Sequence, residues 1–175
     1  MFEDSQNDIL LEVLKRNENM TSGEQVSESN ETLETLESSA RHVFETACDI
    51  ELGAAQPVQS RNEFSGVIAI SGSMSMTIVI NLSLDLVTSV AESLLGLEAD
   101  DVDQETAKDI VCELANMVGG TTKERFGNSL SLGLPTVVIG PDHVVDFGAG
   151  VSVQEIQLGD GPRSIVLEVG VKSFD

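Results

Sequence analysis

The stretch that decides the fold runs from Asp109 to Phe126 and reads Asp-Ile-Val-Cys-Glu-Leu-Ala-Asn-Met-Val-Gly-Gly-Thr-Thr-Lys-Glu-Arg-Phe. Its polar residues recur at steps of 4, 3, 4 and 3, so at 3.6 residues per turn they share one side of a helix. We call this set the polar line: Asp109, Glu113, Asn116, Gly120 and Lys123. The large apolar residues fall on the far side. Because an unpaired carboxylate is costly to bury, we expect the polar line to face solvent or another molecule.

Two residue types on this helix are unusual for a surface that serves only solubility. Asn116 is a poor helix former in mid-helix. Each glycine of the pair Gly119-Gly120 costs about 1 kcal/mol in a helix interior. The pair indicates close approach by a neighbouring backbone or a partner, or else a kink or an early helix end. An ordinary solvated helix face would explain the carboxylates but not these residues.

Other helix signals flank this stretch. Apolar residues recur at steps of 3 and 4 between residues 33 and 50, which predicts a helix with one apolar seam, ended by Gly53. Ser83 is a suitable N-cap for a further helix, and Gly96 closes it. Asp103 is predicted to cap the helix of the polar line, since the acidic run around it lacks the central glycine and distal glutamate of an EF-hand loop.

Strand patterns account for most of the remaining chain. Six segments are predicted as strands: 63–71, 74–82, 129–131, 136–139, 151–158 and 164–171. The apolar residues of the fifth switch parity between Val153 and Ile156, which predicts a bulge. The last strand alternates cleanly, and we expect it to be exposed at an edge, where it could extend a sheet between two subunits. Grouped helices and hairpin-linked strands predict an α+β fold, with a largely antiparallel sheet packed with helices.

The composition of the chain limits the domain organisation and the classes of partner that it can have. The chain has 175 residues, enough for one domain with a proper core, and we expect an acidic flexible N-terminal extension over 1–30 and the domain over 31–175. Its net charge of −21 argues against nucleic acid and against an anionic membrane surface as partners. The N-terminus has no signal-peptide pattern, and no apolar run approaches a membrane span. A cytoplasmic location is the consistent expectation.

The cysteines and histidines form no recognisable site. Cys48 and Cys112 are predicted to be buried free thiols, and no Cys/His cluster indicates a metal. His42 is expected to be structural or solvated. His143 lies in the loop 141–150 without a paired Ser, Cys or carboxylate motif, so we expect an ordinary loop histidine.

With these residues in place, the chain resembles the CheC/CheX/FliY phosphatases of bacterial chemotaxis. The resemblance rests on Asp109-x-x-x-Glu113-x-x-Asn116, extended as Glu-Leu-Ala-Asn-Met-Val-Gly-Gly, and on Leu-Gly-Leu-Pro135-Thr-Val-Val. It covers roughly residues 31–175. Glu-x-x-Asn occurs once, so the chain resembles the single-site CheX form, which dimerises. Eighteen residues separate Asn116 from Pro135, a few fewer than is usual in the family.

The resemblance implies a phosphatase that hydrolyses the aspartyl phosphate of a CheY-like response regulator. By this resemblance, Asn116 of this chain would enter the regulator's active site and orient the attacking water, and Glu113 would pair with a lysine of the regulator. Asp109 would support that contact, and Pro135 would set the loop beside the site. The protein would need no cofactor of its own, because Mg²⁺ is supplied by the regulator. A homodimer is a further expectation.

Two rival interpretations remain at this level. The first is a non-catalytic CheX-like module that binds a receiver domain or a motor component without turnover. The second is an unrelated acidic α+β interaction protein whose motif is fortuitous. The second predicts that the side chains of Glu113 and Asn116 are buried or turned away from the surface.

Overall fold

A computed structural model describes residues 22–54, 63–127, 129–141, 143–160 and 162–172. The helices in these ranges are α2 (Ser22–Cys48), α3 (Leu84–Leu95) and α4 (Gln104–Phe126), with a 3₁₀ turn, η1 (Ala99–Asp101), between the last two. The strands are β1 (Phe64–Ser71), β2 (Ser75–Leu82), β3 (Ser131–Leu132), β4 (Thr136–Ile139), β5 (Val151–Asp160) and β6 (Arg163–Lys172).

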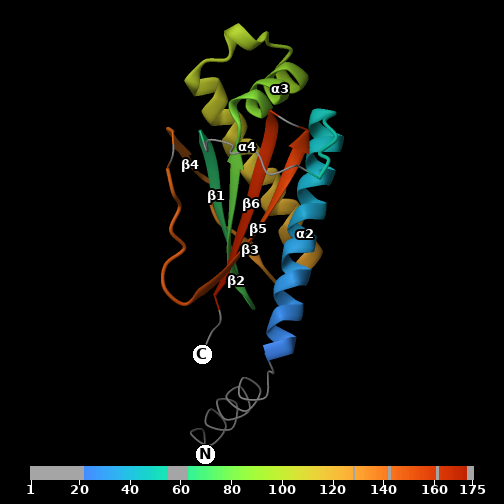
Figure 1. Ribbon diagram of the computed structural model, residues 1–175, viewed down its shortest axis with the longest axis vertical. Helices are drawn as coiled ribbons and strands as arrows, with labels where there is room; N and C mark the ends of the chain where they lie inside the picture. Colours follow the sequence, from blue (N-terminus) through green and yellow to red (C-terminus); the bar gives the residue numbers. More distant parts are fainter. Residues whose placement is uncertain (1–21, 55–62, 128, 142, 161, 173–175) are drawn as a thin grey trace, which may run out of the picture.

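The strands form one antiparallel sheet in the order β3-β1-β2-β6-β5, and β4 also pairs with β1. In Figure 1 the strands stand in front of α4, while α2 runs alongside the sheet and α3 lies at one end. The α+β class and the largely antiparallel sheet packed with helices are therefore confirmed. Ser83 and Asp103 accept hydrogen bonds from the amides of Leu86 and Thr106, and Gly96 ends α3 in the left-handed conformation, as the sequence predicts.

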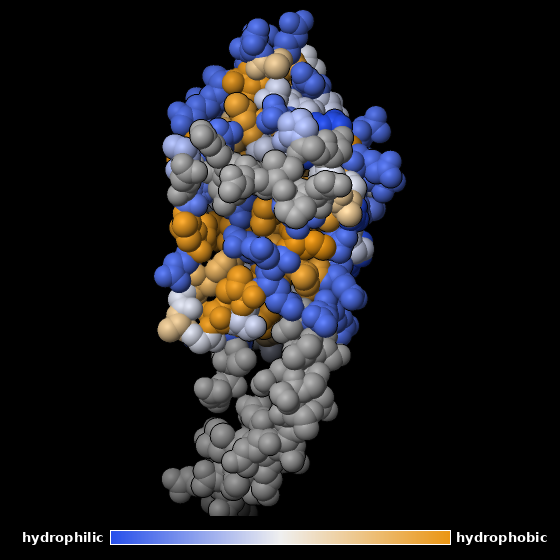
Figure 2. All heavy atoms as spheres, in the orientation of Figure 1, coloured by the Kyte–Doolittle hydropathy of each residue, from blue (hydrophilic) through white to orange (hydrophobic). Residues whose placement is uncertain are grey.

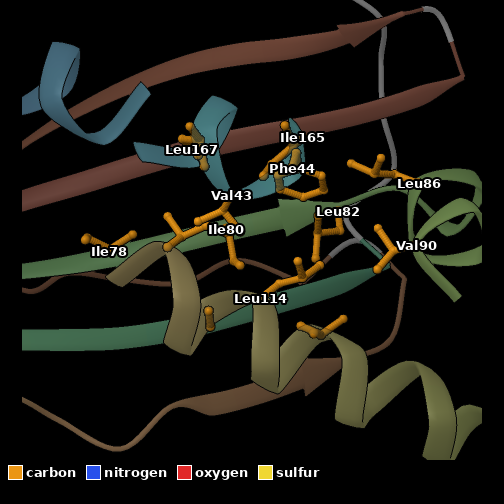
Figure 3. Packing of buried hydrophobic residues seen from close by; sticks show 14 of the residues in the cluster. Val43, Phe44, Ile78, Ile80, Leu82, Leu86, Val90, Leu114, Ile165 and Leu167 are labelled. Atoms are coloured by element: carbon orange, nitrogen blue, oxygen red, sulfur yellow. The ribbon is translucent and has the colours of Figure 1, made fainter. Parts of the chain in front are cut away.

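The core lies between the sheet and the helices. Alternate residues of the central strands are paired across the sheet and buried: Ile68 with Ile78, Ile78 with Val169, and Ile80 with Leu167. Figure 3 shows side chains of α2, α3 and α4, including Phe44, Val90 and Leu114, meeting those of β2 and β6. This single apolar layer fixes which face of each helix is turned inward.

Two glycines let α4 cross β1 closely. A Cβ on Gly66 of β1 would lie 2.8 Å from the Cβ of Ala115 and 3.2 Å from the carbonyl oxygen of Val111. A Cβ on Gly119 of α4 would lie 2.9 Å from Cγ2 of Ile68. Close backbone approach, one of the two explanations for Gly119-Gly120, therefore holds at Gly119, and α4 continues past both glycines to Phe126.

The first described helix differs from its predicted bounds at both ends. α2 begins at Ser22, eleven residues before the predicted apolar seam starts at Leu33, and the sequence from 22 to 31 contains three Glu and one Gln, which are good helix formers. It ends at Cys48 rather than at Gly53, because Asp49 takes a positive φ of 52°. The rest of the expected extension, residues 1–21, lies outside the described residues.

Two expectations about the C-terminal hairpin are wrong. β5 pairs with β6 in unbroken register from Val151↔Lys172 to Asp160↔Arg163, so the parity switch marks no bulge. Instead Ile156 faces the helices, whereas Val153 lies on the opposite face of the sheet and is 45 % exposed. The last strand, β6, lies inside the sheet between β2 and β5, because its alternating apolar residues are needed in the core; the edge strand is β5.

The face of the sheet away from the helices carries the loop 140–150. Phe147 packs over Gly170 of β6, where a Cβ would lie 2.3 Å from its ring. His143 contacts the buried Ser65 on β1, with 2.6 Å between Nε2 and Oγ. His143 lies in a loop, as expected, but its contact with Ser65 was not predicted from the sequence. Figure 2 shows this side, where apolar atoms gather over the middle of the molecule between hydrophilic groups.

Gly66→Ala is expected to destabilise the fold without touching the polar line. Its Cβ would press on Ala115 and on the backbone of Val111, neither of which can rotate away. Overpacking of this kind costs about 1–3 kcal/mol, measured as a lower urea midpoint of unfolding. Ser71→Ala, an exposed change on the same strand, is the control and should stay within about 0.5 kcal/mol. An unchanged midpoint for Gly66→Ala would contradict the close crossing.

Candidate functional site

The polar line is presented by α4, whose opposite face is locked into the core. Asp103 caps the helix, and the hydrogen bond from the Thr106 amide lowers the pKa of its carboxyl group. The buried residues of α4 repeat at helical spacing: Ala107, Ile110, Val111, Leu114, Ala115, Val118, Gly119 and Thr122. Rotation of α4 about its axis would move these residues out of the core, so the outward direction of the polar line is fixed.

The three predicted site residues on α4 are all exposed. Asp109, Glu113 and Asn116 face outward, and the side chain of Asp109 is 73 % exposed beside Lys108 at 3.5 Å. Within the described residues, the side chains of Glu113 and Asn116 make no hydrogen bond or ion pair. Three residues apart on a helix, these two side chains are surface neighbours. The surface therefore offers a carboxylate and a carboxamide whose bonding capacity is available to another molecule.

Pro135 lies in the connection between β3 and β4, at the edge of the sheet. Two residues before Pro135, the amide of Gly133 donates to the carbonyl oxygen of Ala69 at 2.7 Å, so the connection follows β1 alongside Ala69. Leu132, which precedes it, contacts the position of Gly119, where a Cβ would lie 3.2 Å from its Cδ1. The connection therefore flanks α4 near the polar line. Pro135 is half-buried, whereas Leu134 is 92 % exposed.

Chemically, the polar line is suited to positioning rather than to strong acid–base catalysis. A carboxamide can donate through its nitrogen and accept through its oxygen at the same time. A neighbouring carboxylate can bind a cation. In the described part of the chain, no group of three or more His, Cys, Asp or Glu side chains could hold a metal ion. None of the described helices is both long and apolar enough to span a membrane.

Sequence reasoning missed a second polar cluster, on the other face of the sheet. Ser65 donates to Oδ1 of Asn81 and contacts His143, and Nδ2 of Asn81 donates to Glu168 at 2.7 Å. Nδ1 of His143 lies 2.7 Å from the carbonyl oxygen of Gly140. Ser65 is fully buried, so this Ser–His contact joins the loop to the sheet and offers no nucleophile to a substrate. These residues are far apart in sequence, so no local sequence motif predicts that they form a cluster.

An open hollow between α2 and α4 is a weaker candidate site. It is lined in part by Glu37, Ser38, Arg41 and Arg125. Its cations already have partners within the chain, because Arg41 binds Glu37 at 2.8 Å and Arg125 donates to Ser38 at 2.6 Å. None of the residues that line it belongs to the polar line.

The two cysteines differ in environment. Cys48 is buried, as predicted, and burial raises the pKa of its thiol to about 11. Cys112 is only partly buried, contrary to the prediction, because it lies on α4 between the core face and the polar line. It precedes Asn116 by four residues, which is one helical turn.

Comparison with known proteins points to one family. The family model described as "Chemotaxis phosphatase CheX" matches residues 64–156, more than half of the chain and all of α4. No curated protein sequence matches the chain.

Solved structures share this fold. The chemotaxis protein CheX from Vibrio vulnificus superposes with a TM-score of 0.72 at 23 % identity, over 81 % of this chain and 97 % of that one. CheX from Desulfovibrio desulfuricans gives 0.69 at 20 %, over 81 % and 99 %. A CheX–CheY–BeF₃–Mg²⁺ complex from Borrelia burgdorferi gives 0.65 at 19 %, over 80 % and 97 %. At such identities the likeness establishes the fold.

The two thiols should differ sharply in reactivity. With a pKa of about 11, about one part in a thousand of Cys48 is thiolate at pH 8. A maleimide should therefore label Cys112 in the native protein and reach Cys48 only after unfolding, as followed by mass spectrometry with Cys48→Ser as control. Above pH 9.0, the ordinary pKa of a cysteine thiol, the Cys48 thiol ionises in the unfolded chain before it does in the folded one, so the free energy of unfolding should fall as the pH rises further. Equal labelling of both cysteines in the native state would contradict the packing.

Proposed function

The chain belongs to the CheX family of chemotaxis phosphatases, and on this premise we propose that it hydrolyses the aspartyl phosphate of a CheY-like response regulator. The observation that carries the proposal is the exposed, unpartnered pair of Glu113 and Asn116 on a helix whose other face is fixed in the core. A fortuitous motif in an unrelated protein is excluded by family membership, and burial of these side chains, which that alternative requires, is not found.

The reaction needs positioning more than a strong base. A water oxygen attacks phosphorus in line with the bond to the aspartyl oxygen; that bond breaks, the carboxylate leaves with the electron pair, and inorganic phosphate is released. We assign to Asn116 the orientation of this water: the amide oxygen accepts a hydrogen bond from the water while the amide nitrogen donates to the phosphoryl group, and the water's proton leaves with the phosphate. Asn116 thereby acts as glutamine does toward water in GTPases.

Glu113 is assigned to docking. The backbone of Glu113 lies about 4.5 Å from that of Asn116 along the helix axis, so a lysine of the regulator that pairs with the Glu113 carboxylate would place Asn116 beside the phosphoryl group. Asp109, one turn earlier, adds negative charge to the same surface, and its ion pair with Lys108 is weak because the side chains are 73 % and 47 % exposed. Pro135 holds the β3–β4 connection next to this surface.

Mg²⁺ would come with the regulator, where it neutralises charge that develops on the phosphoryl oxygens. The complex from Borrelia burgdorferi, which contains CheX, CheY, BeF₃ and Mg²⁺, supports a partner and a metal of this kind. Response regulators act in the cytoplasm, and this location is part of the proposal. The net charge of −21 makes docking sensitive to ionic strength.

A homodimer through β5 is a further part of the proposal. In the described residues, β5 has a strand partner only on its β6 side, apart from the bridge between Ala54 and Leu158. Two such edges could pair across a two-fold axis, and the polar line on α4 would stay open. Sedimentation should then give about twice the chain mass of 18.6 kDa. Glu155→Pro should return it to the monomer, because Glu155 is exposed and alternates in phase with Gly159, whose N–H donates away from β6 to Gly53. A monomer at micromolar concentration would contradict the pairing.

Asn116→Ala is expected to abolish the stimulated decay of the regulator's phosphate, a loss of about 100-fold or more, because the water is no longer oriented. Glu113→Ala should instead weaken binding of the regulator by about 30-fold or more, because its lysine loses its partner. Decay of ³²P-labelled receiver domains from the same genome measures the first effect, and titration with a beryllofluoride-activated receiver measures the second.

The matched control is Glu92→Ala, which removes an exposed carboxylate from α3. All three variants should keep the wild-type melting temperature. Full activity in Asn116→Ala would refute its role. A wild-type protein that binds the receiver without shortening its phosphate lifetime would instead establish the non-catalytic module, the alternative favoured by the short spacing between Asn116 and Pro135.

A further inference from the structure

Gly120 occupies a place on α4 that the chain's own backbone does not explain. It lies on the polar line between Asn116 and Lys123, and α4 runs through it unbroken. Its φ is not positive, so the conformation is open to any L-residue. A glycine in a helix interior is about 1 kcal/mol less favourable than alanine.

Internal packing does not require this glycine either. A Cβ at Gly120 would meet only Cδ2 of Leu132, at 3.9 Å, which is an ordinary van der Waals contact. The adjacent Gly119 is the opposite case, because its Cβ would meet Ile68 at 2.9 Å. Of this pair, Gly119 is explained by the core and Gly120 is not.

The position of Gly120 gives its missing side chain a consequence for Asn116. Helical side chains lean toward the N-terminus and cover the surface over the preceding turn. Asn116 is the residue one turn before Gly120 on the same line, about 6 Å away along the axis. A side chain at 120 would therefore lie over the flank of the exposed carboxamide.

We propose that Gly120 is a positioning residue of the phosphatase site: its bare backbone lets the phosphorylated receiver domain close against α4, so that the Asn116 carboxamide reaches the phosphoryl group. This inference rests on the proposed function. The contact between Gly120 and the receiver domain sets how deeply Asn116 enters the partner. The glycine at 120 lowers the stability of the helix, and in return the receiver domain can approach α4 more closely in the complex.

The test is a series of increasing size at one position, Gly120→Ala and Gly120→Leu. Both should melt at or above the wild-type temperature, because they raise helix propensity at a site with room for a side chain. Activity should move the other way. Gly120→Ala should lower kcat/KM for the phosphorylated receiver several-fold, and Gly120→Leu should lower it at least tenfold. The Kd for the beryllofluoride-activated receiver should rise at least tenfold in Gly120→Leu.

Glu92→Leu is the control, since it adds the same side chain to an exposed helix surface on α3 and should leave Kd and kcat/KM unchanged. An active wild type together with a fully active Gly120→Leu overturns the role of Gly120 and leaves the proposed function standing. A wild type that binds the receiver without catalysis, and a Gly120→Leu that fails to bind, refutes the proposed function but supports Gly120 as the docking contact. A wild type that neither binds nor catalyses overturns both.

Discussion

The contact between α4 and β1 is the constraint on which the rest of the structure depends. Because Gly66 and Gly119 have no side chains at the crossing, Ala115 of α4 can pack against the backbone of Gly66, and Ile68 of β1 can pack against the backbone of Gly119. A packed interior does not deform smoothly, so this contact has one good geometry. It sets both the height of α4 above the sheet and its rotation about its own axis. One rotation buries eight residues of the helix and leaves Asp109, Glu113 and Asn116 outside.

This arrangement separates stability from function along a single helix. The inward face of α4 carries the aliphatic residues that hold the sheet, and the outward face carries Glu113 and Asn116, whose side chains have no partner among the described residues. In the proposed function these side chains have to be held still, and a helix anchored from Ala107 to Thr122, over about four turns, does this better than a loop. The β3–β4 connection, which contains Pro135, follows β1 and approaches α4 through Leu132. The same division runs through the glycine pair, where Gly119 serves the core and Gly120 faces out.

The sequence alone was enough for what local chemistry determines. Helical periodicity located the polar line, and the side-chain oxygens of Ser83 and Asp103 located two helix starts. It was not enough where a choice depends on distant residues. The contact of His143 with Ser65 joins positions 78 residues apart, and no spacing rule connects them. The place of β6 inside the sheet depends on its pairing with β2 as well as β5. The parity switch in β5 resembled a bulge because an edge strand can place apolar residues on both faces.

The most direct test of the account is the NMR spectrum of the side-chain amide of Asn116, assigned with Asn116→Ala. A receiver domain activated with beryllofluoride and Mg²⁺ is titrated into the labelled protein. The Asn116 side-chain signals and the backbone amides from Glu113 to Lys123 should shift or broaden together, and the signals of residues on the opposite face of the sheet should not change. Perturbations confined to the loop 140–150 or to the edge strand β5, with the Asn116 amide unaltered, would contradict it.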